Sequence, residues 1–240
     1  MSQIPTFPPL MKGLAAGPAN PFAIACDQAR RGVDAGLLTW SVSPERLRAA
    51  LVLAPEVPLE PATAALVACG VGLQNALGVL APPETAVHLD WSGGVRVNGA
   101  HAGGLRLWSA TRDPAALPDW LVVGVELTLT LPPEWEPGET PDRTALDHEG
   151  CGDLDPVAIL ESWSRHSLVW INRLDDPGGR AELNREWSGL AWNLGKQVAH
   201  TLPDERLCGT FLGVDENFGM LLKNAAGTRL IPLSRLIEED

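Results

Sequence analysis

The stretch that decides the fold is residues 90–105, which read DWSGGVRVNGAHAGGL. The Asn98-Gly99 pair stands between alternating apolar residues, and both central positions of a tight hairpin turn need the positive φ that Asn and Gly accept most readily. We therefore expect a hairpin with strands near 94–97 and 103–108, preceded by a short strand near 86–90. His101 then follows directly after the turn.

The next strand along the chain is the clearest in the sequence. From Leu121 to Thr130 every odd position is Leu or Val, and the even positions are mostly small or polar, which is the period of a half-buried strand. A solvated second face is the simpler interpretation. Gly124 favours a pocket instead, because a glycine inside a strand weakens it and often marks close approach by a ligand or another backbone.

The amino-terminal half predicts two helices and two strands. Asn20-Pro21 is a helix start signal, so a helix is expected over 21–32, followed by strands over 36–41 and 47–53. Residues 61–82 are apolar and nearly long enough to cross a bilayer. Gln74, Asn75 and the prolines at both ends favour a buried helix of a soluble protein, and we expect no membrane partner.

The carboxy-terminal half predicts a long loop, two helices and a small β-domain. Residues 132–155 are rich in Pro, Gly, Asp and Glu and read as a surface loop. A helix opened by Asp155-Pro156 and a second one carrying apolar residues from 183 to 198 are expected to form an antiparallel pair. Short strands follow over 207–214, 220–223 and 228–231. The prediction is an α+β fold, with a mixed β-sheet flanked by helices over 1–202 and a small β-barrel over 203–240.

Composition narrows the function classes. The chain has 240 residues and a formal net charge of -12, which opposes binding to phosphate backbones, so nucleic acid is not an expected partner. The amino terminus shows no export signal, and the four cysteines are scattered without metal-binding spacing. These features predict a cytoplasmic protein with reduced thiols.

Four motifs together resemble the biotin/lipoate protein ligase family, in its bacterial biotin-ligase branch without the DNA-binding domain. Residues 90–94 correspond to Lys-Trp-Pro-Asn-Asp and residues 101–105 to Lys-x-Ala-Gly-Ile. Residues 124–128 are similar to Gly-Ile-Gly-Ile-Asn. Residues 213–221 are similar to Gly-Ile-Asp-Glu-x-Gly-x-Leu, with one inserted residue. The resemblance spans most of the chain and implies the ligase catalytic fold with an SH3-like barrel at its end.

The resemblance implies ATP-dependent activation of biotin or lipoate to an acyl-adenylate, followed by transfer to a lysine of an acceptor protein domain, and it leaves a homodimer open. It places His101 at the position of the catalytic lysine that follows the hairpin. The residues expected to line the ligand are Trp91, Gly93, Gly94, Asn98, Gly103, Gly104, Gly124 and Glu126.

The chain also departs from the family pattern. Residues 36–52 contain no Gly-Arg-Gly-Arg run, and Gly93-Gly94 replace Asn-Asp. Removing one positioned charge that stabilises a transition state typically lowers a rate by on the order of 10²–10³. The alternative hypothesis is therefore a non-catalytic small-molecule-binding or interaction module that keeps the ligase fold.

Three weaker alternatives concern single clusters. His88, Asp90 and His101 could form the ligand set of a metal hydrolase, against a chance pairing of histidines at strand spacing. Cys151, in the acidic segment 147–151, could be a thiol nucleophile, against a solvated loop. His101 itself could be an ordinary exposed histidine beside a turn.

Overall fold

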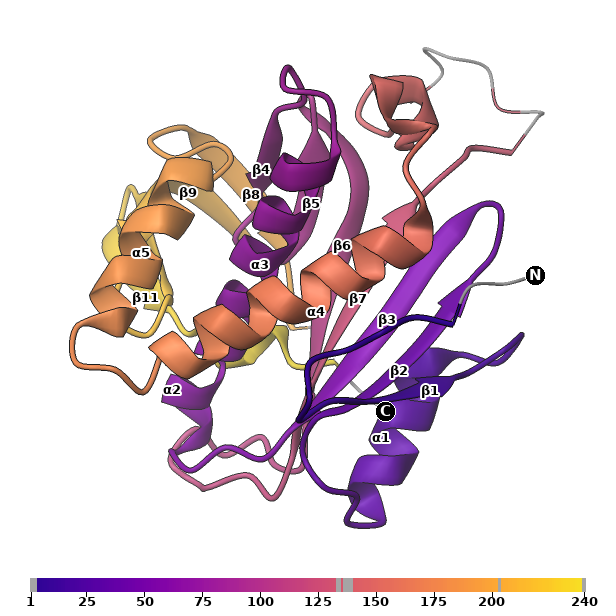
Figure 1. The fold of residues 1–240 in the computed structure, drawn as a ribbon. Helices are drawn as coiled ribbons and strands as arrows, with labels where there is room; N and C mark the ends of the chain where they lie inside the picture. Colours follow the sequence, from indigo (N-terminus) through magenta and orange to yellow (C-terminus); the bar gives the residue numbers. More distant parts are fainter. Residues whose placement is uncertain (1–3, 133–134, 136–139, 203, 239–240) are drawn as a thin grey trace.

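The computed structural model describes residues 4–132, 135, 140–202 and 204–238. Its main body is a seven-stranded sheet in the order β1-β2-β3-β7-β6-β5-β4 (Figure 1). β1 and β2 are parallel, and every other neighbouring pair in this sheet is antiparallel. The strands are β1 (Lys12–Ala15), β2 (Leu37–Val42), β3 (Arg46–Leu53), β4 (Val87–Leu89), β5 (Gly94–Val97), β6 (Ala100–Ser109) and β7 (Leu121–Thr128).

Helices cover both faces of this sheet unequally. α1 (Pro21–Arg30) packs alone on one face, which we call the outer face, where Phe22 and Trp108 form a small apolar cluster with residues of β3 and β7. The other face carries the main core beneath α3 (Ala64–Leu80), α4 (Pro156–Arg173) and α5 (Gly179–Leu190). α2 (Leu59–Ala62) leads into α3. The predicted mixed sheet flanked by helices is confirmed.

Local sequence signals explain where the helices begin. The side chain of Asn20 accepts a hydrogen bond from the backbone N–H of Phe22, and Asp155 does the same for Val157 at the start of α4. Each side chain satisfies a helix N–H that has no partner within the helix. Proline follows at the first helical position in both cases, because it lacks the N–H that would otherwise be unpaired there.

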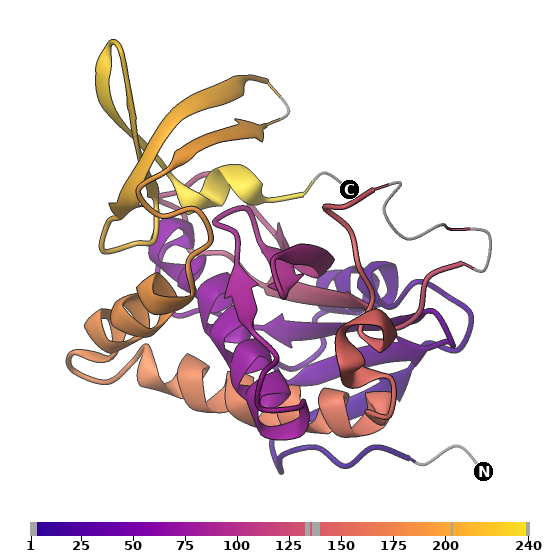
Figure 2. The same cartoon turned by 90° about the horizontal axis from the view of Figure 1, so that it is seen from above.

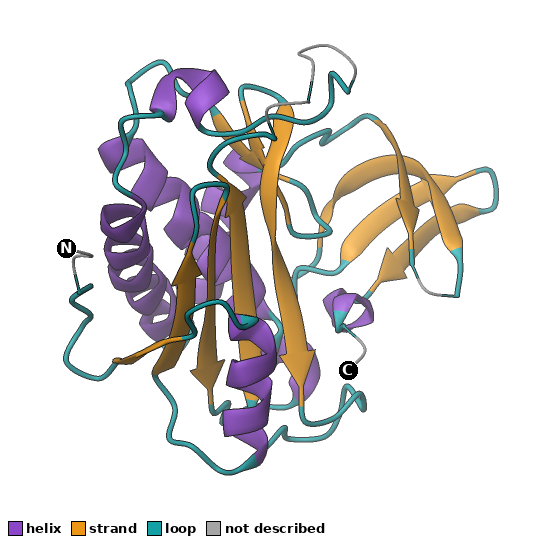
Figure 3. Cartoon of the chain, turned by 90° about the vertical axis from the view of Figure 1, so that its right-hand side faces the viewer, coloured by secondary structure: helices purple, strands orange, loops and turns teal. Residues whose placement is uncertain are grey.

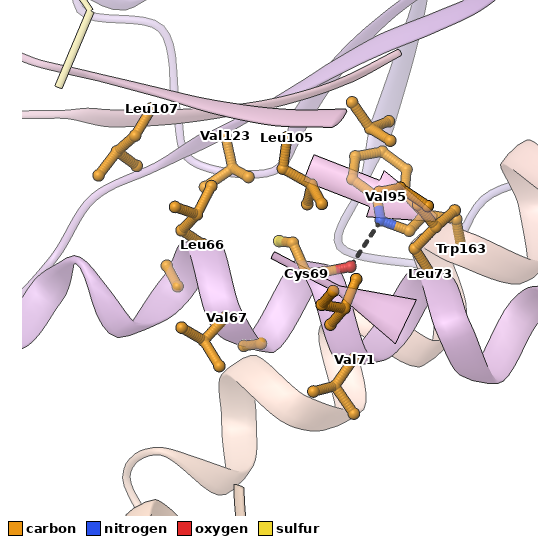
Figure 4. Packing of buried hydrophobic residues seen from close by; sticks show 14 of the residues in the cluster. Leu66, Val67, Cys69, Val71, Leu73, Val95, Leu105, Leu107, Val123 and Trp163 are labelled. Atoms are coloured by element: carbon orange, nitrogen blue, oxygen red, sulfur yellow. Dashed lines mark hydrogen bonds between the residues drawn. The ribbon is translucent and has the colours of Figure 1, made fainter. Parts of the chain in front are cut away.

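α3 is the central helix of the core. The segment Leu59–Leu80 is long and apolar enough to cross a membrane, but 72% of its most apolar window is buried within the protein. Its neighbours include Trp163 of α4, whose indole N–H donates to the carbonyl of Cys69 at 3.1 Å (Figure 4). Burial raises the pKa of the Cys69 thiol to about 12, so this cysteine is a core residue.

A second, smaller sheet follows α5. Its strands are β8 (Gln197–Thr201), β9 (Arg206–Val214), β10 (Met220–Asn224) and β11 (Gly227–Ile231), all antiparallel, in the order β11-β10-β9-β8. Figure 2 shows it standing beside the main body. Among the described residues β8 and β11 do not pair with each other, so the expected SH3-like barrel is not confirmed.

Two features of the carboxy-terminal half differ from prediction. The second helix was expected to reach Val198 but ends at Leu190, because Asn193 and Gly195 adopt positive φ and Val198 pairs with Gly209 in the small sheet. The first strand of the small sheet, β8, therefore lies before residue 203, where the sequence predicted the small domain to begin. α4 and α5 are joined by a short turn, but the main partner of α4 is α3.

Several contacts attach the small sheet and the residues after it to the main body, among them a hydrogen bond from Asn184 of α5 to the Asp215 carbonyl at 3.2 Å and the two that follow. The indole N–H of Trp91 donates to the carbonyl of Phe218 at 2.9 Å, at the turn between β9 and β10. Beyond a short 3₁₀ helix, η2 (Leu233–Leu236), Ile237 pairs with Leu107 of β6, and the N–H of Glu238 donates to the Leu107 carbonyl at 2.8 Å. The chain therefore returns to its main sheet after forming the small one.

Candidate functional site

One residue from each of five neighbouring strands lies in a single row across the main sheet. The pairs that define it are Ser41–Arg48, Arg48–Glu126, Glu126–Gly104 and Gly104–Gly94. Residues that pair directly across strands place their side chains on the same face. We call these five residues the polar row, and three of them, Glu126, Gly104 and Gly94, were predicted to line a ligand.

The polar row lies on the outer face, beyond the part that α1 covers. α1 packs over Ala50, Val52 and Val122, which follow Arg48 and precede Glu126 along their strands. Figure 3 looks onto this face, with α1 in front of one half of the strands and the small sheet to one side. The side chain of Glu126 is 23% exposed, so solvent reaches this part of the row.

The charges of the polar row are only partly paired. Glu126 accepts a hydrogen bond from Arg46 at 3.1 Å. Within the described part of the chain, the half-buried guanidinium of Arg48 has no ion-pair or hydrogen-bond partner. The N–H groups of the planar Arg48 guanidinium are therefore available to a ligand, and their geometry suits a carboxylate.

A charged cluster closes one end of the row at Gly94. Arg96 Nε lies 3.1 Å from each carboxylate oxygen of Asp90, and Arg96 Nη2 lies 2.7 Å from Nε2 of His101. The Arg96 guanidinium also lies 5.1 Å from the Trp192 ring centroid. A Cβ on Gly94 would meet the Asp90 carboxylate at 2.5 Å and the His101 ring at 2.9 Å, so this glycine makes room for the cluster.

The surroundings of His101 favour the neutral form of its imidazole. Burial lowers its pKa below the ordinary value, Arg96 and Arg143 act in the same direction, and Asp90 and Asp142 only partly oppose them. A neutral ring can accept the hydrogen bond that the Arg96 guanidinium donates to Nε2. The 3.4 Å separation of His101 and Asp90 is therefore a polar contact between a carboxylate and an imidazole whose neutral form is favoured.

The remaining predicted site residues lie elsewhere and have structural roles. Gly124 is buried on the outer face, where a Cβ would meet Trp108 at 2.8 Å and Phe22 at 2.9 Å. The close approach that we predicted at this glycine is real, but aromatic side chains of the protein itself occupy the space. Ligand contact at Gly124 stays a prediction, and the neighbours that the structure shows there are Trp108 and Phe22.

Three more predicted residues are required by backbone or domain contacts. Trp91 is 3% exposed and donates its indole hydrogen bond to Phe218, so it helps to hold the small sheet against the main body. A Cβ on Gly93 would lie 2.4 Å from the Leu105 carbonyl, and one on Gly103 would lie 2.0 Å from the Glu126 carbonyl. Both glycines permit strands to approach.

Asn98 and Gly99 form the predicted hairpin turn, with φ values of 51° and 95°. The Asn98 amide donates to Glu149 at 2.7 Å and its oxygen accepts from the Ala86 N–H. The turn is thereby tied to segment 147–151. Cys151 in that segment is 3% exposed, and its sulfur lies 3.7 Å from the Glu149 carbonyl. A buried thiol is poorly placed to act as the nucleophile considered from the sequence.

The ligand set considered for a metal hydrolase does not assemble. Asp90 and His101 lie 3.4 Å apart but both contact the Arg96 guanidinium, while His88 packs against Trp192 with ring centroids 5.2 Å apart. The described residues contain no cluster of three or more His, Cys, Asp or Glu side chains suited to a metal ion.

The sequence analysis did not identify two arginines of the site, Arg48 and Arg96, and it did not predict how short the β2–β3 connection is. Arg48 alternates with Leu47 and Ala49 along β3, a signal for a polar face, but its row partners depend on the strand order. Arg96 was not considered, although it lies within the deciding stretch. β2 and β3 are joined by only three residues, 43–45, so the expected place of a Gly-Arg-Gly-Arg loop holds a tight turn.

Comparisons with known proteins agree with this fold. The family model described as "Biotin/lipoate A/B protein ligase family" matches residues 7–189, and a domain of unknown function, DUF4444, matches residues 203–239. A biotin–[acetyl-CoA-carboxylase] ligase of Paracoccus denitrificans is 25% identical over 200 residues, covering 82% of each chain.

Solved structures extend the likeness over nearly the whole chain. A biotin protein ligase-like protein of unknown function from a Silicibacter species is 54% identical, with a TM-score of 0.90 over 98% of this chain and 100% of that one. The biotin protein ligase of Aquifex aeolicus in complex with biotin and ATP is 17% identical, with a TM-score of 0.67 over 92% and 95%. The match to residues 7–189 shows that this chain belongs to the biotin/lipoate A/B protein ligase family.

Proposed function

We propose that this member of the family binds a small carboxylic acid on the polar row and does not activate it with ATP. Biotin and lipoate are the first candidates, since a ligase of the same fold is known in complex with biotin and ATP. The proposal combines family membership with the altered charges of the site, and it favours the binding-module hypothesis over an active ligase.

The observation that carries the proposal is the Asp90–Arg96 pair. Asp90 stands where the family motif begins with lysine, and Arg96 is held on both of its carboxylate oxygens. The two charges of this pair cancel, so it offers no net positive charge to a triphosphate, and the guanidinium is not available to a second anion. His101, whose neutral form is favoured, adds little positive charge. These residues do not fit ATP.

The tight turn between β2 and β3 supports the same conclusion. The resemblance assigns the arginines of a glycine-rich loop to charge stabilisation during acid activation, and residues 43–45 are Ser, Pro and Glu. Electrostatic stabilisation is commonly the largest single contribution to such a reaction. The site thus differs from the family pattern at Asp90, at His101 and at the turn 43–45. Binding is the function that its remaining groups can perform.

The polar row offers complementary ends for a monocarboxylate. Arg48 can receive the carboxylate at one end, and His101 with Asp90 can contact a polar group at the other. Arg48 and Gly94 are three strand spacings apart, about 14 Å. Glu126 and Gly104 lie between them. The Glu126 carboxylate is paired with Arg46, and Gly104 leaves space for the body of the ligand against the sheet.

The test measures activation and binding separately. ATP–pyrophosphate exchange is assayed with biotin, lipoate and octanoate, with an active biotin protein ligase as the positive control, and binding of the same acids is measured by calorimetry. We expect no exchange above background and binding of at least one acid. Arg48→Gln should weaken that binding about tenfold or more, whereas Arg206→Gln, on an exposed strand of the small sheet, should not.

Each part of the proposal can fail on its own. Exchange above background would show an active ligase and overturn the claim of no activation. Absence of binding by all three acids, or equal binding by the Arg48→Gln variant, would overturn the polar row as the ligand site. An acceptor protein domain would then be sought only if exchange were detected.

A further inference from the structure

A cavity lies at the junction between the main sheet and the small sheet. Its volume is about 430 Å³, within the range of small-molecule sites, and it lies where two parts of the fold meet, a common place for such sites. Its floor comes from α3 and β6, and residues 235–238 form the facing wall. It is distinct from the polar row, none of whose five residues lines it.

The lining divides into an apolar part and a charged part. Leu66, Leu105, Leu107 and Leu202 form the aliphatic part of the lining, and each is at most 6% exposed. A hydrocarbon body is favoured over water against the surface that they do offer. Arg106 and Glu238 supply charge, with Arg106 Nε 3.9 Å from a Glu238 carboxylate oxygen. A second guanidinium, that of Arg235, is already engaged by Asp204 and Glu205.

Arg106 is available to an incoming anion. A separation of 3.9 Å is too long for a hydrogen bond, so the pair is a weak, solvent-screened contact. The Arg106 and Glu238 side chains are 53% and 43% exposed. The backbone of Glu238 is fixed by its hydrogen bond to Leu107, and Arg112 donates to its carbonyl at 3.0 Å. Its side chain can therefore move away while the wall stays in place.

We propose that this junction cavity is a second binding site, for an amphipathic monocarboxylate whose hydrocarbon body lies on the leucines and whose carboxylate pairs with Arg106. In the absence of ligand, Glu238 stands in for that carboxylate. Removing the charge of Arg106 should then lower the affinity for the ligand, and removing the charge of Glu238 should raise it, because Arg106 attracts the carboxylate and Glu238 competes with it. This inference does not depend on what occupies the polar row.

The test uses heptanoate as the probe and heptanamide as its uncharged analogue. Titration of the full chain is followed by methyl NMR, with calorimetry for affinity. We expect heptanoate to shift the methyl signals of Leu66, Leu105 and Leu107, and heptanamide to bind at least about tenfold more weakly. Arg106→Gln should weaken heptanoate binding to a similar extent, and Glu238→Gln should strengthen it about two- to threefold.

Arg185→Gln is the control, since it removes an exposed arginine of α5 that lies outside both the cavity and the polar row. It should leave heptanoate binding unchanged, and its thermal unfolding, with that of Arg106→Gln, verifies that both variants fold. The inference is overturned if the leucine methyl signals do not move, if heptanamide binds as well as heptanoate, or if Arg106→Gln and Glu238→Gln change the affinity in the same direction. None of these results bears on ATP–pyrophosphate exchange or on the effect of Arg48 on binding at the polar row.

Discussion

Trp91→Phe separates the role that the sequence suggests for this tryptophan from the role that the structure shows. The substitution keeps an aromatic ring at a position that is 3% exposed but removes the N–H that donates to the Phe218 carbonyl at 2.9 Å. The carbonyl is left in a buried place without its partner. We expect the attachment of the small sheet to weaken and ligand binding at the polar row to be unaffected.

The size of the effect follows from the lost hydrogen bond. An acceptor left unsatisfied on burial costs about 1–3 kcal/mol. In a chain of this size each kcal/mol lowers the melting temperature by about 2–4 °C, so a decrease of about 2–12 °C is expected. The measurement is calorimetric unfolding, supported by hydrogen exchange of the β9–β10 turn, which should open more readily in the variant.

Trp135→Phe provides the control. The indole of Trp135 donates to the hydroxyl of Thr140 at 2.9 Å, but this contact is exposed, so its loss should change stability by less than about 0.5 kcal/mol. If Trp91→Phe is as stable as the wild type and instead loses ligand affinity, the docking role assigned to Trp91 is wrong and the ligand-lining role predicted from the sequence is correct.

Three further predictions concern other groups. Asp90→Asn leaves the partly buried Arg96 guanidinium without its carboxylate, and we expect a loss of about 3 kcal/mol in urea unfolding; an unchanged midpoint would show that the pair is not structural. Burial lowers the pKa of His101 and of His200, so the unfolded chain binds more protons than the folded one below the ordinary value of about 6.5. Stability should therefore fall as the pH is lowered from 7 through that value, and less steeply in a His101→Gln, His200→Gln variant; equal slopes would contradict the assignment. Gly124→Ala forces a methyl group against two aromatic rings and should cost about 1–3 kcal/mol by thermal unfolding, without altering binding of acids.

The parts of the fold that sequence patterns predicted correctly are those set by neighbouring residues. The Asn98-Gly99 turn, the start of α1 at Asn20-Pro21 and the alternation along β7 each depend on local geometry. The extension of the second helix to Val198 was wrong because apolar spacing continued past the point where two residues with positive φ end the helix. The family resemblance supplied the overall architecture that local patterns leave open.

The candidate site was predicted less completely, because its residues meet through strand order. Arg48, Glu126 and Gly104 become neighbours only because β3, β7 and β6 lie side by side, and no pattern within any one strand specifies that order. Gly124 shows the converse case. Its position in the strand correctly indicated a close approach, but only the packing of α1 identifies which group approaches.

The pairing of Ile237 with Leu107 has a consequence for the order in which the protein can be assembled. During synthesis from the amino terminus, β6 is complete about 130 residues before its partner leaves the ribosome. Until then the peptide N–H and C=O groups at this edge of β6 have no hydrogen-bond partner and lie beside an apolar surface. Such an edge promotes pairing between chains. Ribosomes that stop short of Ile237 would thus release polypeptides with an uncovered strand, and such products should be early targets for chaperones and proteases.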